Sequence, residues 1–292
     1  MESNWIEAGG RVYCLRYPGP PDATPFVLVH GLGGSHANWL PIVPGLARHG
    51  TVYAIDLAGF GRTPPEGRSA SVEANVALLN RVLAVLGRPV VLIGNSMGGA
   101  ISILQAAAHP DSVAGLVLVD PALPPRYSHV FDRAGAQFLA AFAIPAAGIP
   151  MAQRRLRKVG PERVAMKGLK MCTVDYRRVD PAVVAEQIAI MRERMDQPWT
   201  TPAFLEASRS LVRLLARRRE FLRTVRAVVA PTLMLMGRQD RLVPLAAAEA
   251  VARVRADWDF VVFDDVGHVP QLEAPRHTLA AIERWLGTSQ IR

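Results

Sequence analysis

Residues 90–98, with the sequence VVLIGNSMG, join a short apolar run to a segment of helical length. A run this short and this apolar favours a strand buried on both faces. Gly94 and Gly98 flank Ser96 in a G-x-S-x-G pattern, and the following helix should begin at Met97. Glycines permit a sharp turn that a Cβ atom would obstruct. The stretch therefore predicts a strand, a tight turn and a helix, with the Ser96 hydroxyl exposed above the sheet; a simple helix-capping turn is the alternative.

Similar apolar runs recur along the chain, with helix-length segments between them. They lie at residues 26–30, 51–56, 113–120, 232–237 and 259–264. Such alternation predicts parallel strands joined by crossover helices. Two strand-like runs around Gly9-Gly10 predict an opening β-hairpin. The expected fold is α/β, with a mostly parallel eight-stranded sheet and helices on both of its faces.

The alternation stops at Pro121. From there to about Ala230 the sequence has amphipathic, Arg-rich helical stretches broken by prolines, and no strand pattern. Strand-like sequence resumes at Thr232. We therefore expect a core domain of residues 1–120 and 231–292, interrupted after the sixth strand by a helical insertion of residues 121–230.

Composition limits the class of protein. Half of the 292 residues are hydrophobic, which is enough for a buried core. Cys14 and Cys172 are the only cysteines, so we expect neither a disulfide framework nor a zinc site. The first residues lack the basic start and the apolar run of a secretory signal. We predict a cytoplasmic protein that needs no metal ion or other cofactor.

The formal net charge of +9 is concentrated in the insertion, which carries 20 of the 34 Lys and Arg residues but 9 of the 25 Asp and Glu residues. We expect no nucleic-acid binding, because aromatic residues do not interleave with the basic ones and no known module is present. The basic residues stand beside an uncharged stretch, 134–153, whose prolines argue against a membrane span. Weak peripheral association with an anionic membrane surface through the insertion is our hypothesis; a solvated helix face is the alternative.

A serine hydroxyl is a weak nucleophile near neutral pH and needs an imidazole that removes its proton. His268 follows the last predicted strand in a short loop, at the same edge of the sheet as Ser96. Asp240 follows the preceding strand and would hold the imidazole in the required tautomer. Asp120, at the end of the strand after the Ser96 helix, is a competing acid. The predicted chain order is Ser96, Asp240, His268.

A tetrahedral oxyanion needs preorganised hydrogen-bond donors. The backbone N–H of Met97, at the start of the helix, is one candidate. The glycine-rich loop 30–34 follows a predicted strand, and its Leu32 N–H is the second candidate. The alternative is that this loop is an ordinary glycine-rich connection between a strand and a helix; its occurrence together with the turn at Ser96 favours the role in oxyanion binding.

Four segments in this order resemble the α/β-hydrolase superfamily: His30-Gly31, Gly94 to Gly98, Asp240 and Gly267-His268. The resemblance covers nearly the whole chain outside the insertion. It implies that the insertion is a helical cap over the active site. Residues 56–63 resemble the turn after the fourth strand of that superfamily, where we expect Asp56 to accept hydrogen bonds from turn amides. Epoxide hydrolases and haloalkane dehalogenases have an aspartate in place of Ser96, so we do not expect those activities.

Residues 94–99 are also similar to the corresponding turn of serine C–C hydrolases that cleave ring-fission products. The chain departs from that group at residues 30–34, where a proline is usual, and at Val269, where an aromatic residue is common. We therefore expect hydrolysis of a carboxylic ester or thioester through an acyl-enzyme, with C–C hydrolysis of a vinylogous diketone as the alternative. A non-catalytic ligand-binding or interaction protein on this scaffold is an alternative of another class.

The expected substrate is a hydrophobic small molecule or lipid, because an apolar segment of the insertion would suit an acyl chain or aromatic group if it faces Ser96. The segment contains Phe138, Leu139, Phe142, Ile144, Ile149 and Met151. Packing of these side chains against the core domain is the alternative. The oligomeric state is not predicted.

Overall fold

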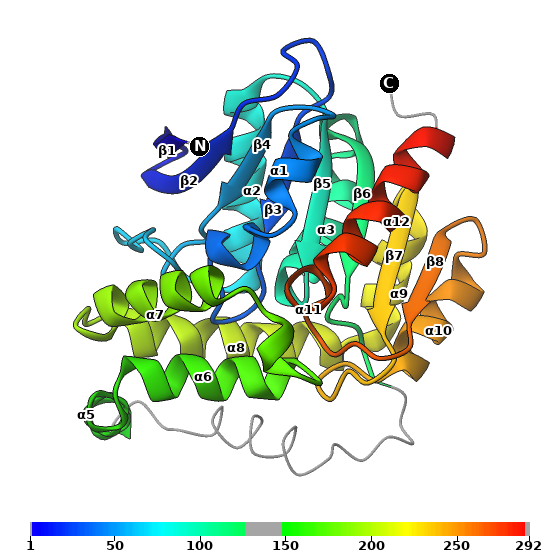
Figure 1. Cartoon of the computed structure of the whole chain (residues 1–292). Coiled ribbons are helices and arrows are strands. Elements are labelled where there is room, and N and C mark those ends of the chain that lie inside the picture. Colours follow the sequence, from blue (N-terminus) through cyan, green and yellow to red (C-terminus); the bar gives the residue numbers. More distant parts are fainter. Residues whose placement is uncertain (1, 126–147, 290–292) are drawn as a thin grey trace.

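The apolar runs form the strands of one sheet in a computed structural model that describes residues 2–125 and 148–289. The strand order is β1-β2-β4-β3-β5-β6-β7-β8 (Figure 1). The strands are β1 (Glu2–Glu7), β2 (Arg11–Tyr17), β3 (Phe26–Val29), β4 (Val52–Ile55), β5 (Val90–Asn95), β6 (Val113–Val119), β7 (Thr232–Gly237) and β8 (Asp259–Phe263).

The sheet is mostly parallel, as the sequence predicts. β1 pairs with β2, and β2 with β4, in antiparallel fashion; every other neighbouring pair is parallel. The predicted hairpin is present, and Gly9 and Gly10 turn between its strands with φ of 71° and 116°, values that favour glycine. Because the parallel strands run in one direction, their carboxyl ends meet at one edge, where β5, β6, β7 and β8 deliver the candidate site residues.

Helices cover both faces of the sheet. One face packs against α2 (Val72–Leu86), α3 (Met97–Ala108), α9 (Arg218–Ala227) and α10 (Leu245–Val254). The other packs against the short helices η1 (His36–Trp39) and α1 (Val43–Leu46) and against α12 (Pro275–Thr288). The remaining short helices of the core domain are η2 (Pro110–Ser112) and α11 (Pro270–Glu273). This arrangement explains why the central strands are buried along their whole length.

The described part of the insertion is helical. Its helices are α5 (Ile149–Val159), α6 (Pro161–Cys172), η4 (Tyr176–Arg178), α7 (Pro181–Met195), α8 (Thr200–Ala216) and α9. Figure 1 shows α6, α7 and α8 beside the carboxyl edge of the sheet. α8 and α9 also pack against the core domain: α9 contacts α3, and Leu211 of α8 and Phe221 and Val225 of α9 belong to the core on that face of the sheet. The division into domains at residues 121 and 230 stays a prediction.

Most of the uncharged stretch 134–153 lies outside the described residues, including Phe138, Leu139, Phe142 and Ile144. No helix in the described ranges is long and apolar enough to cross a membrane. Met151 lies on α5 with 78% of its surface exposed. An exposure this high does not fit the alternative that Met151 packs against the core domain.

Candidate active site

Ser96 lies between β5 and α3 with φ of 54° and ψ of −120°. A residue with a side chain is strained at such a φ and stays there only where its surroundings hold it. A Cβ atom on Gly98 would lie 2.2 Å from the Val29 carbonyl oxygen, and one on Gly94 would lie 2.5 Å from the Gly98 carbonyl oxygen. The two glycines therefore allow the close packing of this turn, which leaves Ser96 partly exposed.

His268 and Asp240 meet at the same edge of the sheet. His268 Nδ1 lies 2.6 Å from Asp240 Oδ2, and the exposed fractions of the two side chains are 5% and 0%. Asp240 Oδ1 accepts hydrogen bonds from the backbone N–H groups of Leu242 at 2.7 Å and Val243 at 3.0 Å. These bonds fix the carboxylate, and its contact with Nδ1 leaves Nε2 of the imidazole for another partner.

Asn95 connects the Ser96 turn to the His268 loop. Its Nδ2 donates to the carbonyl oxygen of His268 at 3.1 Å and to that of Val119 at 2.9 Å. Within the described ranges, Ser96 Oγ makes no hydrogen bond to His268. Such bonds are often long in substrate-free enzymes and tighten when substrate binds. The structure thus brings Ser96, Asp240 and His268 to one place, joined by Asn95.

Asp120 occupies the same buried corner. Its Oδ1 accepts a hydrogen bond from the Gly237 N–H at 2.9 Å. Polar atoms of Asp120, Asp240 and His268 all lie within 4.8 Å of one another, a spacing that would also suit a metal ion. The direct contact with His268 Nδ1 nevertheless belongs to Asp240, so the geometry favours Asp240 over Asp120 as the partner of the histidine.

The loop 30–34 lies directly against Ser96. A Cβ atom on Gly31 would be 2.9 Å from the Ser96 Cβ, and the loop closes with a hydrogen bond from Gly34 N–H to the Gly31 carbonyl oxygen. Leu32 is in this loop, and Met97 is the first residue of α3. This arrangement is compatible with Leu32 and Met97 as oxyanion donors, and that role stays a prediction.

Glu273, the last residue of α11, is a site residue that the sequence did not predict. Its Oε2 accepts a hydrogen bond from Gly267 N–H at 2.8 Å, and its Oε1 accepts one from Asp175 N–H, in the insertion, at 2.7 Å. His268 N–H also donates to the Cys172 carbonyl oxygen at 2.7 Å. The one available signal was an acid within a short apolar stretch after His268, and it does not identify the hydrogen-bond partners.

Two further polar groups beside the site support its loops. Asp56 accepts hydrogen bonds from the N–H groups of His36 at 2.6 Å and Arg62 at 2.8 Å, which confirms its expected role with turn amides. His30 Nε2 accepts a bond from Leu57 N–H at 3.0 Å. Burial lowers the pKa of His30 to about 4, so this imidazole is neutral and structural at neutral pH.

Comparisons with known proteins agree with this architecture. A family model described as the alpha/beta hydrolase family matches residues 26–282. The chain is 31% identical over 276 residues to a 2-hydroxy-6-oxo-2,4-heptadienoate hydrolase of Pseudomonas putida, covering 90% of this chain and 88% of that one. It is 28% identical over 270 residues to a pimeloyl-[acyl-carrier protein] methyl ester esterase of Klebsiella pneumoniae, covering 89% and 94%. Among solved structures, a thermophilic esterase from Thermogutta terrifontis superposes with a TM-score of 0.72 at 25% identity, covering 98% of each chain. The chain therefore belongs to the alpha/beta hydrolase family.

Proposed function

We propose that this alpha/beta hydrolase is a serine hydrolase that cleaves a carboxylic ester, or thioester, of a hydrophobic small molecule or lipid. The observation that carries the proposal is the 2.6 Å contact between His268 Nδ1 and the buried Asp240 carboxylate. Asn95 holds this pair beside the strained turn at Ser96. A partly exposed serine next to an oriented, carboxylate-paired imidazole is the arrangement that acyl transfer requires.

The proposed reaction assigns one role to each residue. Ser96 Oγ attacks the carbonyl carbon while His268 Nε2 takes its proton, and the imidazolium then gives that proton to the leaving alkoxide or thiolate. Asp240 stabilises the imidazolium. The N–H groups of Leu32 and Met97 stabilise the oxyanion. Water hydrolyses the acyl-enzyme by the same proton transfers in reverse.

Labelling with a fluorophosphonate probe tests the activated serine. We expect the native protein to react, and the Ser96→Ala variant not to react. Asp240→Asn should lower kcat by about 10⁴-fold, because the histidine then adopts the wrong tautomer. A native protein that folds but fails to label would favour the alternative of a non-catalytic binding protein.

Hydrolysis of a carbon–carbon bond is the second candidate, supported by 31% identity to the Pseudomonas putida 2-hydroxy-6-oxo-2,4-heptadienoate hydrolase. Ester and C–C hydrolysis both suit a serine beside a histidine, so the comparison does not separate them. Purified protein should be assayed on a chain-length series of model esters, on a thioester and on a vinylogous diketone. A higher kcat/KM for the diketone than for every ester would reverse our order of preference. Among the esters, a preference for acetyl over all longer acyl groups would count against a hydrophobic substrate.

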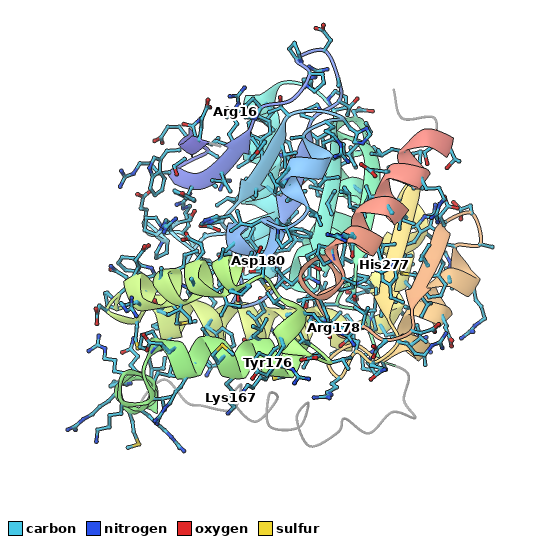
Figure 2. All side chains as sticks on the ribbon, viewed as in Figure 1. Arg16, Lys167, Tyr176, Arg178, Asp180 and His277 are labelled. Carbon is cyan, nitrogen blue, oxygen red and sulfur yellow. The ribbon has the colours of Figure 1, made fainter. Side chains whose placement is uncertain are left out.

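We also propose weak association of the insertion with an anionic lipid surface, because α5 and α6 expose basic and apolar side chains together. The exposed basic residues are Arg154, Arg155, Arg157, Lys158, Arg163, Lys167 and Lys170. In the parts of the chain that the structure describes, none of them is ion-paired with an acid. Met151, Leu156 and Val159 on α5 are exposed by 78%, 38% and 40%. Figure 2 shows Lys167 on the side of α6 away from the sheet.

Co-sedimentation with vesicles tests this association. We expect binding to vesicles that contain phosphatidylserine, weaker binding to phosphatidylcholine alone, and release by salt, since each basic residue contributes about 1 kcal/mol near such a surface. Arg154→Glu with Arg155→Glu should abolish the binding. The matched control, Arg276→Glu with Arg284→Glu, changes two exposed arginines on α12, far from α5 (Figure 1). Binding that is independent of anionic lipid, or equal loss in both double variants, would contradict the proposal.

A further inference from the structure

Two carboxyl groups share the buried corner behind His268. The Asp120 residue is 0% exposed, and so is the Asp240 side chain. The two carboxyl groups lie within 4.8 Å of each other, and neither has a cationic lysine or arginine partner in the described ranges. Two negative charges this close in a fully buried corner repel each other strongly. One of the two groups must therefore hold a proton at neutral pH.

The hydrogen bonds decide which group is ionised. Asp240 receives three donors, the N–H groups of Leu242 and Val243 and the Nδ1 of His268, which together stabilise a carboxylate. Asp120 receives a single donor, the Gly237 N–H, on Oδ1. Its Oδ2 is fully buried and accepts no bond from any donor in the described residues. A buried oxygen without a donor suits a hydroxyl that donates its own proton.

The groups around Asp120 favour the same assignment. Burial raises the pKa of Asp120 well above its ordinary value and the charge of Asp240 raises it further, while the hydrogen bond from the Gly237 N–H has a smaller, opposite effect. Burial also raises the pKa of Cys172, at the end of α6, to about 12, so this thiol adds no charge. Asp120 has φ of 42°, a backbone conformation that aspartate tolerates better than most residues.

We propose that Asp120 is a protonated carboxylic acid that donates a hydrogen bond to the Asp240 carboxylate, and so positions Asp240 against His268. Asp120 is then a positioning residue, because it acts through Asp240 and touches no reacting atom. The role rests on the proposed serine hydrolase chemistry. A protonated Asp120 can hold the Asp240 carboxylate in place without adding a second negative charge beside the histidine.

Kinetics of two variants test the role. Asp120→Asn keeps the shape, the neutral charge and an N–H donor toward Asp240, so we expect kcat/KM to stay within about threefold of the native value. The pKa of the acid limb of its pH profile should not move. Asp120→Leu removes the donor, and we expect kcat to fall by about 10- to 100-fold with little change in KM. If Asp120 were ionised, Asp120→Asn would remove a negative charge near His268 and shift the acid limb to lower pH.

Infrared difference spectroscopy tests the protonation state without any substrate. We expect a carbonyl stretching band of a buried carboxylic acid at neutral pH in the native protein and in Ser96→Ala, and its loss in Asp120→Asn. A native protein without this band, or an Asp120→Asn variant with a shifted acid limb, would overturn the proposal. Absence of fluorophosphonate labelling in the native protein would instead contradict the proposed function. The two failures are therefore distinguishable.

Discussion

The strained backbone of Ser96 lies between two glycines that have no room for a side chain. Val29, Gly94 and Gly98 pack so tightly that a single added methyl group would collide with a backbone carbonyl. The strain of about 1–3 kcal/mol that such a conformation costs is offset by the rest of the fold. Activity and stability are thus coupled at this turn, and substitutions of its glycines should affect both.

Gly98→Ala should lower the free energy of unfolding by about 2–3 kcal/mol, because its Cβ would lie 2.2 Å from the Val29 carbonyl oxygen. We expect fluorophosphonate labelling to slow as well. The control is Gly168→Ala on α6, where a Cβ atom meets nothing within 4 Å. That variant should be more stable by about 0.5–1 kcal/mol, since alanine favours a helix. Urea denaturation measures both; equal stability of the two variants would contradict the packing argument.

His30 should make stability depend on pH. Burial holds its pKa at about 4 in the folded protein, against about 6.5 in the unfolded chain. Between these pH values the unfolded chain binds more protons at His30 than the folded protein does. The contribution of neutral His30 to the free energy of unfolding is therefore complete above about pH 6.5 and is lost as pH falls toward about 4. We expect a loss of up to about 3 kcal/mol over this window. Urea denaturation from pH 7.5 to 4.5 should show a shallower decline in His30→Gln; an unchanged decline would assign the loss to other groups.

At the scale of elements, the insertion is bonded directly to the loop that carries His268. The end of α6 accepts the N–H of His268, and Glu273 joins Gly267 to Asp175. Val269 and Leu272 pack with Val183 of α7 in one small apolar cluster. The position of the histidine is therefore set in part by the insertion and not by the sheet alone.

Glu273→Ala should lower kcat by about 10- to 100-fold, because the buried N–H of Gly267 and the partly buried N–H of Asp175 lose their acceptor and the His268 loop loosens. The side chain of Glu273 is 0% exposed, so water replaces it poorly. Arg177→Ala is the matched control: it removes a 77% exposed partner of the Asp175 carboxylate in the same region, without touching Glu273, and should change kcat by less than about threefold. Steady-state kinetics and labelling rates measure the effect. Similar rates for both variants would exclude a special role for Glu273.

At the scale of the whole molecule, the insertion has a second attachment at the turn after β4. Arg62 bonds Glu193 through two contacts of 2.9 Å and lies 3.0 Å from Glu186, both on α7. The buried Arg194 donates to the Gly59 carbonyl oxygen at 2.9 Å. The insertion thus rests on both the Asp56 turn and the His268 loop, on either side of the Ser96 turn.

Arg62→Ala should loosen α7 without unfolding the core. Loss of about 1 kcal/mol for each of the two carboxylate partners predicts amide hydrogen exchange in α7 that is about 5- to 30-fold faster. The control is Arg48→Ala, which breaks the Arg48–Glu283 pair on the core domain and should leave α7 unchanged. Mass spectrometry of peptides from α7 measures the exchange. Equal exchange in the two variants would mean that Arg62 does not hold the insertion.

Local patterns in the sequence predicted much of this molecule. Each predicted apolar run became a strand within about two residues of its expected bounds, and α3 begins at Met97 as expected. These features depend on contacts between near neighbours, such as the glycines beside Ser96. The short helices η1, α1 and α11 were not predicted, because so few residues carry no recognisable period.

The sequence by itself determined the fold class, the turn at Ser96 and the placement of Asp120, Asp240 and His268 at the ends of strands. Only the tertiary structure decided which acid meets His268. β6 and β7 are adjacent and parallel, so Asp120 and Asp240, which follow their carboxyl ends, lie side by side. The pattern of strands in the sequence therefore does not distinguish the two acids. The loop after β7 carries Asp240 to His268 Nδ1, while Asp120 stays behind it against Gly237. That difference, and the bonds of Glu273 to the insertion, arise from packing between residues far apart in the chain, which no local pattern encodes.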